Sequence, residues 1–261
     1  MLTPAEVVAR AAARGVDVLA LTDHDELSGL AEARAAAREA GIAFVCGTEV
    51  SVSWDDTTIH ILGLNIDPDN APLAAGLATI RTGRSERARR IGEALADAGI
   101  EGAYAGAMRY VTSERLIART HFARFLVEAG HVRGMKDVFK RYLGRGKPGY
   151  VPHQWATLTQ AVGWIRAAGG QATLAHPGRY PLSDTRMREL LAAFRDEGGA
   201  AVEVLSPSHN SAQCAEFAAH ARAFDLRGSC GSDFHGPGES WLDLGDLPDL
   251  PLGVVPVWTG W

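Results

Sequence analysis

Histidine and acidic side chains stand at the ends of several short apolar stretches of the chain. Segments 22–25, 47–49, 175–178 and 231–235 each end such a stretch, and segment 58–60 lies inside another. Imidazole nitrogens and carboxylate oxygens together suit zinc, manganese or iron, and a bridging carboxylate can hold two cations at the separation that phosphoryl chemistry uses. The pattern therefore predicts a metal centre for hydrolysis, with Glu49 as the bridge. The candidate metal ligands are His24, Glu49, His60, His176, Asp233 and His235.

A single histidine of this kind is more often a hydrogen-bonded residue of the core or surface than a metal ligand. Five segments at corresponding strand positions are a stronger signal, because the carboxyl ends of strands converge on one face of an α/β barrel. Asp23 and Asp25 flank a candidate ligand, and a carboxylate there typically orients the other ring nitrogen of the histidine. We therefore expect them to support the site or its turn. Metal-activated water is the expected nucleophile.

The elements that must position these residues alternate between helices and short apolar strands. Helices are predicted over 4–14, 30–40, 157–168, 186–197 and 211–224, and strands over 18–21, 43–50, 58–66, 171–175, 200–205 and 227–231. Such alternation is typical of an α/β fold with a mostly parallel sheet or barrel. Segment 236–261 is rich in Gly, Pro and Trp and is expected to be irregular.

The alternation of helices and strands stops between residues 71 and 149. Charged helices are predicted there over 82–98, 121–128 and 134–142. We interpret 71–149 as a helical insertion that caps the substrate site, so that the metal-binding domain comprises residues 1–70 and 150–261. Arginines 81, 84, 87, 89 and 90 fall on the first of these helices. A solvated helix face is the simpler interpretation of this run, and RNA contact is the alternative.

Net charge, cysteine content and hydrophobic runs limit the kinds of binding partner and the cellular location that we expect. The net charge of −5, from 26 basic and 31 acidic residues, argues against duplex DNA binding through a basic face but fits a small phosphorylated substrate. Three cysteines without a CxxC pair predict neither a disulfide framework nor a zinc ribbon, and Cys46 is expected in the core rather than as a thiol nucleophile. Neither a secretion signal nor an apolar run of about 20 residues is visible. We expect a cytoplasmic protein without a membrane segment.

The histidine and acidic segments together resemble the successive motifs of the polymerase and histidinol phosphatase (PHP) family. They read Leu-Ala-Leu-Thr-Asp-His-Asp at 19–25, Gly-Thr-Glu-Val at 47–50, His-Ile-Leu-Gly at 60–63, Ala-His-Pro-Gly at 175–178 and Gly-Ser-Asp-Phe-His at 231–235. The resemblance runs from Leu2 to the end of the chain. Segments 119–124 and 144–151 are similar to the insertion of the bacterial branch of nucleoside 3',5'-bisphosphate phosphatases and 5'-to-3' exoribonucleases.

The resemblance implies a distorted (βα)7 TIM-like barrel with up to three divalent cations, Mn²⁺ first and Fe²⁺ or Zn²⁺ as alternatives. It implies that Glu49, His60 and His176 bind one metal. Glu49 would also bind a second metal, together with Asp233. His24 and His235 would bind a third. Family members begin with a strand that carries a His-x-His pair and is followed by an Asp, whereas Met1 stands where the next turn should end. The resemblance therefore predicts an absent first strand, one complete ligand set, two depleted sets and impaired activity. Because every later ligand position still holds a competent residue, we attribute the departure to a misplaced start codon or a shortened chain rather than to evolved loss.

Candidate substrate contacts are mostly cationic side chains, because a guanidinium offers phosphate a bidentate fork. They are Arg119, His121, Arg124, Lys147, Arg179, Ser206 and His209. Tyr150 and Tyr180 are candidates to stack on a base. The alternative interpretation for each is a solvated surface charge or a packed aromatic.

The functional hypothesis is a metal-dependent phosphoesterase that acts through metal-activated hydroxide. Its expected substrates are 3',5'-bisphosphate nucleotides such as pAp, nucleoside monophosphates, or short single-stranded RNA attacked from the 5' end. Two alternatives stay open. One is a phosphatase for a small metabolite such as histidinol phosphate, which would need no base-stacking insertion. The other is a catalytically inactive nucleotide-binding module.

Overall fold

A computed structural model describes residues 2–111, 117–239 and 241–261, and it divides the chain into two compact units. The first unit comprises Met1–Leu77 and Ala156–Trp261, and the second comprises Ala78–Trp155. Parts of the predictions lie outside the described residues. They include Met1, in the predicted metal-binding domain, and residues 112–116, in the predicted insertion. The role of 71–149 as a cap stays a prediction.

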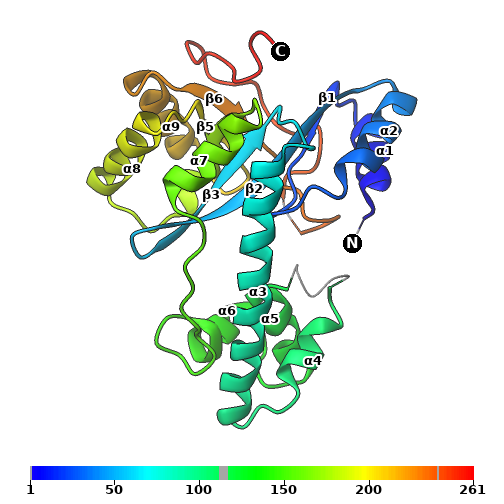
Figure 1. The fold of residues 1–261 in the computed structure, drawn as a ribbon, viewed down its shortest axis with the longest axis vertical. Helices are drawn as coiled ribbons and strands as arrows, with labels where there is room; N and C mark the ends of the chain where they lie inside the picture. The colour runs from blue at the N-terminus through cyan, green and yellow to red at the C-terminus, as the bar shows by residue number, and fades with distance from the viewer. Residues whose placement is uncertain (1, 112–116, 240) are drawn as a thin grey trace. The chain divides into compact units, whose positions relative to one another are not determined.

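The first unit is built on one curled sheet (Figure 1) whose strand order is the order along the chain. Its strands are β1 (Val18–Leu21), β2 (Ala43–Trp54), β3 (Thr57–Leu64), β4 (Gln171–Leu174), β5 (Ala201–Leu205) and β6 (Arg227–Cys230). All five residues of β5 are buried, as expected for a strand covered on both faces. The fold is therefore mixed α/β, as predicted, with six strands among the described residues.

Strand β3 is antiparallel to its neighbours in a sheet that was predicted to be mostly parallel. It runs antiparallel to both β2 and β4, whereas the pairs β1–β2, β4–β5 and β5–β6 are parallel. Trp54 pairs with Thr57, so only Asp55 and Asp56 connect β2 to β3, and Asp55 has a φ of 46°. A two-residue connection with positive φ forms a tight hairpin, which forces the two strands to be antiparallel.

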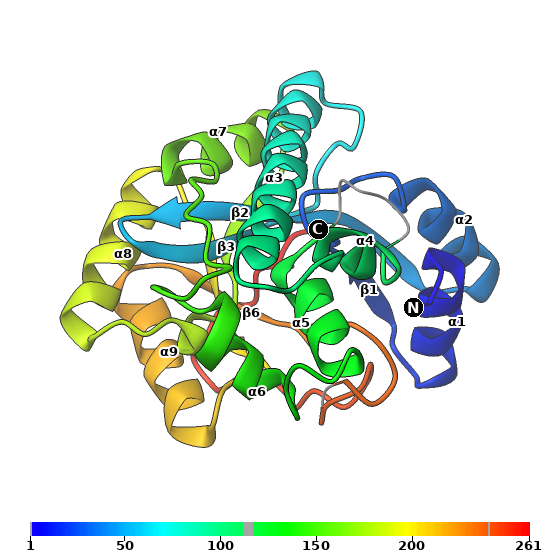
Figure 2. The ribbon, with the colours of Figure 1, turned by 90° about the horizontal axis from the view of Figure 1, so that it is seen from below.

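Helices flank the sheet of the first unit. They are α1 (Pro4–Ala13), α2 (Leu30–Ala40), α7 (Leu158–Ala167), α8 (Asp184–Asp196) and α9 (Ser211–Ala223). Figure 2 shows α1 and α2 together at one end of the sheet and α8 and α9 at the other. Helix α7 packs on β2, β3 and β4, and α9 packs on β5 and β6. Thr3, Thr157 and Asn210 cap their helices through reciprocal side-chain bonds, so the sequence itself sets where α1, α7 and α9 begin.

The second unit is helical around its own core. Helix α3 (Ala71–Asp97) begins in the first unit and ends in the second, which also holds α4 (Ala103–Met108), α5 (Arg119–Glu128), α6 (Met135–Val138) and the π-helix η2 (Phe139–Leu143). Its core includes Ile91, Leu95, Phe122, Leu126 and Leu143. The sequence predicted α3 only from residue 82 and did not predict α4, which is made largely of Ala and Gly.

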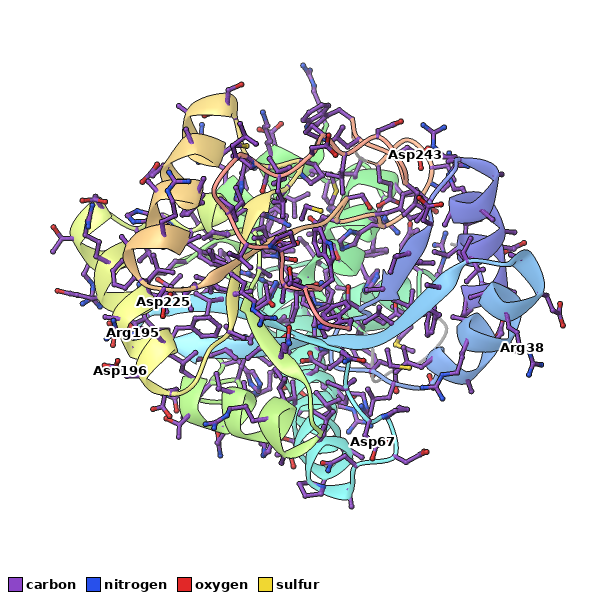
Figure 3. The ribbon with its side chains drawn as sticks, turned by 90° about the horizontal axis from the view of Figure 1, so that it is seen from above. Arg38, Asp67, Arg195, Asp196, Asp225 and Asp243 are labelled. Atoms are coloured by element: carbon purple, nitrogen blue, oxygen red, sulfur yellow. The ribbon has the colours of Figure 1, made fainter. Side chains whose placement is uncertain are left out.

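The described part of segment 236–261 forms neither a helix nor a strand, as predicted. Side chains tie it back to α1, because Arg10 pairs with Asp243, and Arg14 Nη2 lies 2.6 Å from Asp246 Oδ1. Figure 3 labels Asp243 beside α1. No helix in the described ranges has the length and apolar character needed to cross a membrane.

Candidate metal centre

Glu49 lies at the centre of a cluster of histidines in the first unit. Its Oε1 lies 2.9 Å from both His60 Nδ1 and His176 Nε2, and its Oε2 lies 3.4 Å from His24 Nδ1. Glu49 is only 5% exposed. A buried carboxylate of this kind requires charged or hydrogen-bonding partners, and the three imidazoles supply them.

Strand pairing sets these distances. The β2–β3 register places Ser51 opposite His60, so Glu49, two residues before Ser51, points to the same face as His60. The N–H of Glu49 donates to the Asp23 carbonyl over 3.1 Å, which brings the segment after β1 beside β2. His176 follows β4, the strand next to β3. Ligands that are distant in sequence are therefore brought together by the sheet.

The spacing of three donor atoms fits a single cation. His60 Nδ1 and His176 Nε2 lie 3.3 Å apart, and each lies 2.9 Å from Glu49 Oε1. Donors bound to one zinc ion at about 2.1 Å lie roughly 3.0–3.4 Å apart, a range that includes the 3.3 Å distance and begins just above the two 2.9 Å distances. Two imidazole nitrogens that face each other need a proton or a cation between them. We call these three side chains the Glu49 triangle.

The other predicted ligands lie around the Glu49 triangle. Two groups of these residues have ligand atoms within 4.8 Å of one another, namely His24, Glu49 and His60, and Glu49, His176 and Asp233. The ring centroids of His24 and His235 lie 6.0 Å apart, and His235 Nδ1 lies 2.8 Å from the Asp233 carbonyl oxygen. All six predicted ligands are thus gathered in one place. Their binding of metal stays a prediction.

The electrostatics of the Glu49 triangle favour an ionised carboxylate. Burial raises the pKa of Glu49, but the charges of His24 and His60 and the hydrogen bond with His176 outweigh it, so the pKa lies well below its usual range. Burial lowers the pKa of His176, but its hydrogen bond and attraction to Glu49 outweigh burial and raise it. Positive charge is therefore stabilised at this point, whether a proton or a metal ion carries it.

Two residues support the triangle in ways that the sequence analysis did not predict. Glu203 accepts the N–H of His176 over 2.6 Å, and burial raises the pKa of this acid to about 7. The Tyr180 hydroxyl accepts the His60 N–H over 2.9 Å and donates to the Ala175 carbonyl over 2.8 Å. Tyr180, predicted as a base-stacking residue, thus links two ligand segments. The sequence does contain a pattern that could have predicted a role for Glu203, because Glu203 is the one charged residue in the apolar strand Ala201–Leu205.

Asp25 and Asp23 lie beside the candidate ligands, as part of the turn after β1. The fully buried Asp25 carboxylate accepts the N–H and the hydroxyl of Ser51 over 2.7 and 2.9 Å. Asp23 contributes its backbone carbonyl, which accepts from Glu49 and from the Thr48 hydroxyl. Both residues therefore position the segment that carries His24.

Three predicted substrate contacts belong to the first unit. Arg179 Nη1 donates to Asp233 Oδ2 over 2.8 Å, which places a half-exposed guanidinium beside the candidate ligands. Both nitrogens of His209 are engaged, Nε2 with the Gly178 N–H and Nδ1 with the Val204 carbonyl. Ser206 is buried. Arg179 is thus the candidate among the three with a charge open to solvent.

The remaining predicted substrate contacts belong to the second unit. Arg119 lies over the Phe139 ring, 5.8 Å from its centroid, and His121 Nδ1 accepts the Ala118 N–H over 2.9 Å at the start of α5. Arg124 lies on the same helix, and Lys147 is exposed in the loop after η2. Their contact with substrate stays a prediction.

Positive charge is concentrated in the second unit. Burial, followed by the charges of Arg119 and Arg84, lowers the pKa of Arg87 to about 10. Arg84 and Arg87 lie 4.7 and 5.6 Å from the ring of Trp155, so these two arginines form a cation–π stack rather than only a solvated helix face. Burial and three arginines likewise lower the pKa of His153 to about 4. Such a cluster favours the binding of anions.

The chain is similar to known bacterial phosphatases and exoribonucleases. The chain is 54% identical over 257 residues to the 3',5'-nucleoside bisphosphate phosphatase of Chromobacterium violaceum, covering 98% of this chain and 90% of the relative. It is 44% identical over 262 residues to the 5'-3' exoribonuclease Rnm of Escherichia coli, covering 100% of this chain and 89% of the relative. A solved structure of an amidohydrolase from Chromobacterium violaceum, with bound sulfate and no metal, superposes with a TM-score of 0.93 at 53% identity, covering 99% of this chain and 90% of that one.

The α/β sheet and its clustered histidines and carboxylates define a hydrolase with candidate metal-binding groups. The PHP domain family matches residues 1–204. The chain therefore belongs to the PHP family, as its motifs predicted, and this family is one of phosphoesterases.

Proposed function

We propose that this protein is a divalent-metal-dependent phosphoesterase that hydrolyses the phosphate esters of nucleotides. Its proposed substrate classes are 3',5'-bisphosphate nucleotides such as pAp, nucleoside monophosphates and short single-stranded RNA. The observation that carries the proposal is the Glu49 triangle, whose two nitrogens and one oxygen lie 2.9 to 3.3 Å apart. The names of the phosphatase and exoribonuclease relatives support the choice of nucleotides.

In this proposal Glu49, His60 and His176 hold one cation, and His24, Asp233 and His235 complete the neighbouring positions. When bound, divalent cations lower the pKa of coordinated water and neutralise charge on phosphoryl oxygens. Mn²⁺ is the proposed metal, as the resemblance to the PHP family implies, and the carboxylate donors of the cluster suit it, whereas Fe²⁺ and Zn²⁺ are the alternatives that suit its imidazoles. The sheet is proposed to be part of a (βα)7 barrel of PHP type, and the protein is proposed to act in the cytoplasm.

The protein's own residues supply orientation and charge. Glu203 and Tyr180 fix the backbones of two ligand segments, so the donor atoms are held before substrate arrives. Arg179 is proposed to hold a phosphoryl oxygen, since its guanidinium already lies beside a carboxylate of the cluster. Arg119, His121, Arg124 and Lys147 are proposed to bind the rest of the nucleotide.

Product release from a panel of substrates tests the proposal, measured as inorganic phosphate from the monoesters and as mononucleotide from RNA. The metal-stripped chain is supplied with Mn²⁺, Fe²⁺ or Zn²⁺ and offered pAp, mononucleotides, a short 5'-phosphorylated RNA and histidinol phosphate. We expect metal-dependent release that is fastest with one of the nucleotide substrates. Preference for histidinol phosphate would contradict the substrate class, and nucleotide binding without hydrolysis under any metal would contradict the enzyme itself.

A pair of glutamate variants links activity to the site. Glu49→Gln keeps the size of the side chain but removes its charge, and we expect it to abolish phosphate release. Glu39→Gln makes the same change at an exposed position on α2 and should leave release unchanged. Equal activity of the two variants would contradict the role of Glu49.

A further inference from the structure

A second group of potential metal ligands lies between α8 and α9, among residues that the Glu49 triangle does not use. Asp184 is the first residue of α8, and Glu216 and His220 stand four positions apart on α9. Residues at this spacing share one face of a helix. The ligand atoms of the three side chains all lie within 4.8 Å of one another.

His220 is the unusual member of this group. It is only 3% exposed and lies between the rings of Phe217 and Phe224, at centroid distances of 5.9 and 6.2 Å. Its Nε2 is buried and has no hydrogen-bond partner within the described residues. A buried nitrogen without a partner is unfavourable, so its placement calls for a ligand.

The nitrogen points at two carboxylates. Nε2 lies 3.6 Å from Asp184 Oδ1 and 3.7 Å from Glu216 Oε1, too far for good hydrogen bonds. Both distances are within a few tenths of an ångström of the roughly 3.4 Å that separates donors around a tetrahedral zinc ion. A cation between the three atoms would satisfy the nitrogen and both carboxylates at once.

The two carboxylates are exposed to solvent, whereas the imidazole is buried. The side chains of Asp184 and Glu216 are 62% and 46% exposed, against 4% for His220. Asp184 Oδ2 accepts from Arg188 Nε over 3.1 Å, which leaves Oδ1 directed at His220. One buried nitrogen and two exposed oxygens therefore offer three ligands to a metal and leave its remaining positions to water.

A solvent path reaches the group. A hollow of about 100 Å³ is lined by Asp184 and Glu216 together with Gly178, Tyr180, Gln213 and Phe217. Hydrated ions can therefore approach the two carboxylates from solvent.

We propose that Asp184, Glu216 and His220 form a zinc site that links the start of α8 to α9. An imidazole and two carboxylates are donors that zinc accepts readily, and zinc binds such sites more tightly than manganese does. The site is distinct from the Glu49 triangle in its residues, and only the activity measurement described below rests on the proposed function.

Equilibrium dialysis of the full chain against buffered free Zn²⁺, with zinc counted by elemental analysis, tests the proposal. The double variant Asp184→Asn, Glu216→Gln alters exposed side chains only and should hold one zinc ion fewer per chain than the wild type. The control Asp196→Asn changes an exposed acid of the same helix (Figure 3), about 18 Å along it, and should keep the wild-type count. Equal counts in the wild type and the double variant would overturn the proposal.

Phosphate release by the same proteins identifies which zinc is lost. We expect the double variant to keep at least half of the wild-type rate with its preferred substrate, because the missing ion belongs to the α8–α9 site. A lower zinc count accompanied by loss of all activity would overturn the proposal, since the missing ion would then belong to the Glu49 triangle.

Discussion

The Glu203 carboxylate accepts the backbone N–H of His176 over 2.6 Å, so a buried acid fixes the segment that carries a candidate metal ligand. His176 has a φ of 28°, a backbone conformation that residues other than glycine rarely adopt. Such a conformation persists only where surrounding contacts hold it in place. The hydrogen bond thus connects the stability of the core to the geometry of the Glu49 triangle.

Replacing Glu203 by alanine should destabilise the protein and weaken the site. The buried N–H of His176 would lose its acceptor, at a cost of roughly 1–3 kcal/mol, while Glu203→Gln retains an amide oxygen and should cost less. Urea unfolding of both variants measures the difference, and metal-dependent phosphate release should fall more in the alanine variant. Equal stability of the alanine variant and the wild type would show that this bond does not contribute.

Arg119→Ala should raise the KM for pAp by about 10- to 150-fold, because a charge-assisted hydrogen bond to phosphate contributes roughly 1.5–3 kcal/mol. Arg133, an arginine of the same unit that was not predicted to contact substrate, provides the matched control as Arg133→Ala. Steady-state kinetics with pAp compares the two. An unchanged KM in Arg119→Ala would remove this arginine from the proposed substrate contacts.

The second unit should lose stability in mild acid because of His121. Burial, followed by the charges of Arg124 and Arg84, lowers the pKa of His121 to about 4 from 6.5. The unfolded chain therefore binds the proton more readily, so the stabilising effect of the neutral ring is present above pH 6.5 and is lost as the pH falls towards 4.

His121→Gln keeps an acceptor for the Ala118 N–H but does not titrate, so its stability should fall less between pH 6.5 and 4 than that of the wild type. Urea unfolding followed by tryptophan fluorescence at several pH values measures the slope. Identical slopes in the two proteins would exclude His121 as the source.

Local patterns were enough to predict most of the elements and the six candidate ligands. Strand ends such as 22–25 and 231–235 carry their signal in adjacent residues, and Thr3 and Asn210 mark helix starts through their own side chains. The same patterns did not predict the antiparallel β3, because its direction depends on Asp55 adopting a positive φ. Local sequence also does not encode which side chains meet across strands.

The support for the site illustrates this limit. Glu203 and His176 are 27 residues apart, and Tyr180 and His60 are 120 apart, so only the folded sheet reveals that they are bonded. Likewise, the second unit shows that Arg84 and Arg87 stack on Trp155, whereas spacing alone favoured a solvated face.

Anomalous diffraction from a crystal soaked with Zn²⁺ tests the central claim most directly, because it locates the ion without reference to activity. The account predicts a peak about 2.0–2.2 Å from each of Glu49 Oε1, His60 Nδ1 and His176 Nε2. A crystal that binds zinc elsewhere but shows no anomalous density between these three atoms would contradict it.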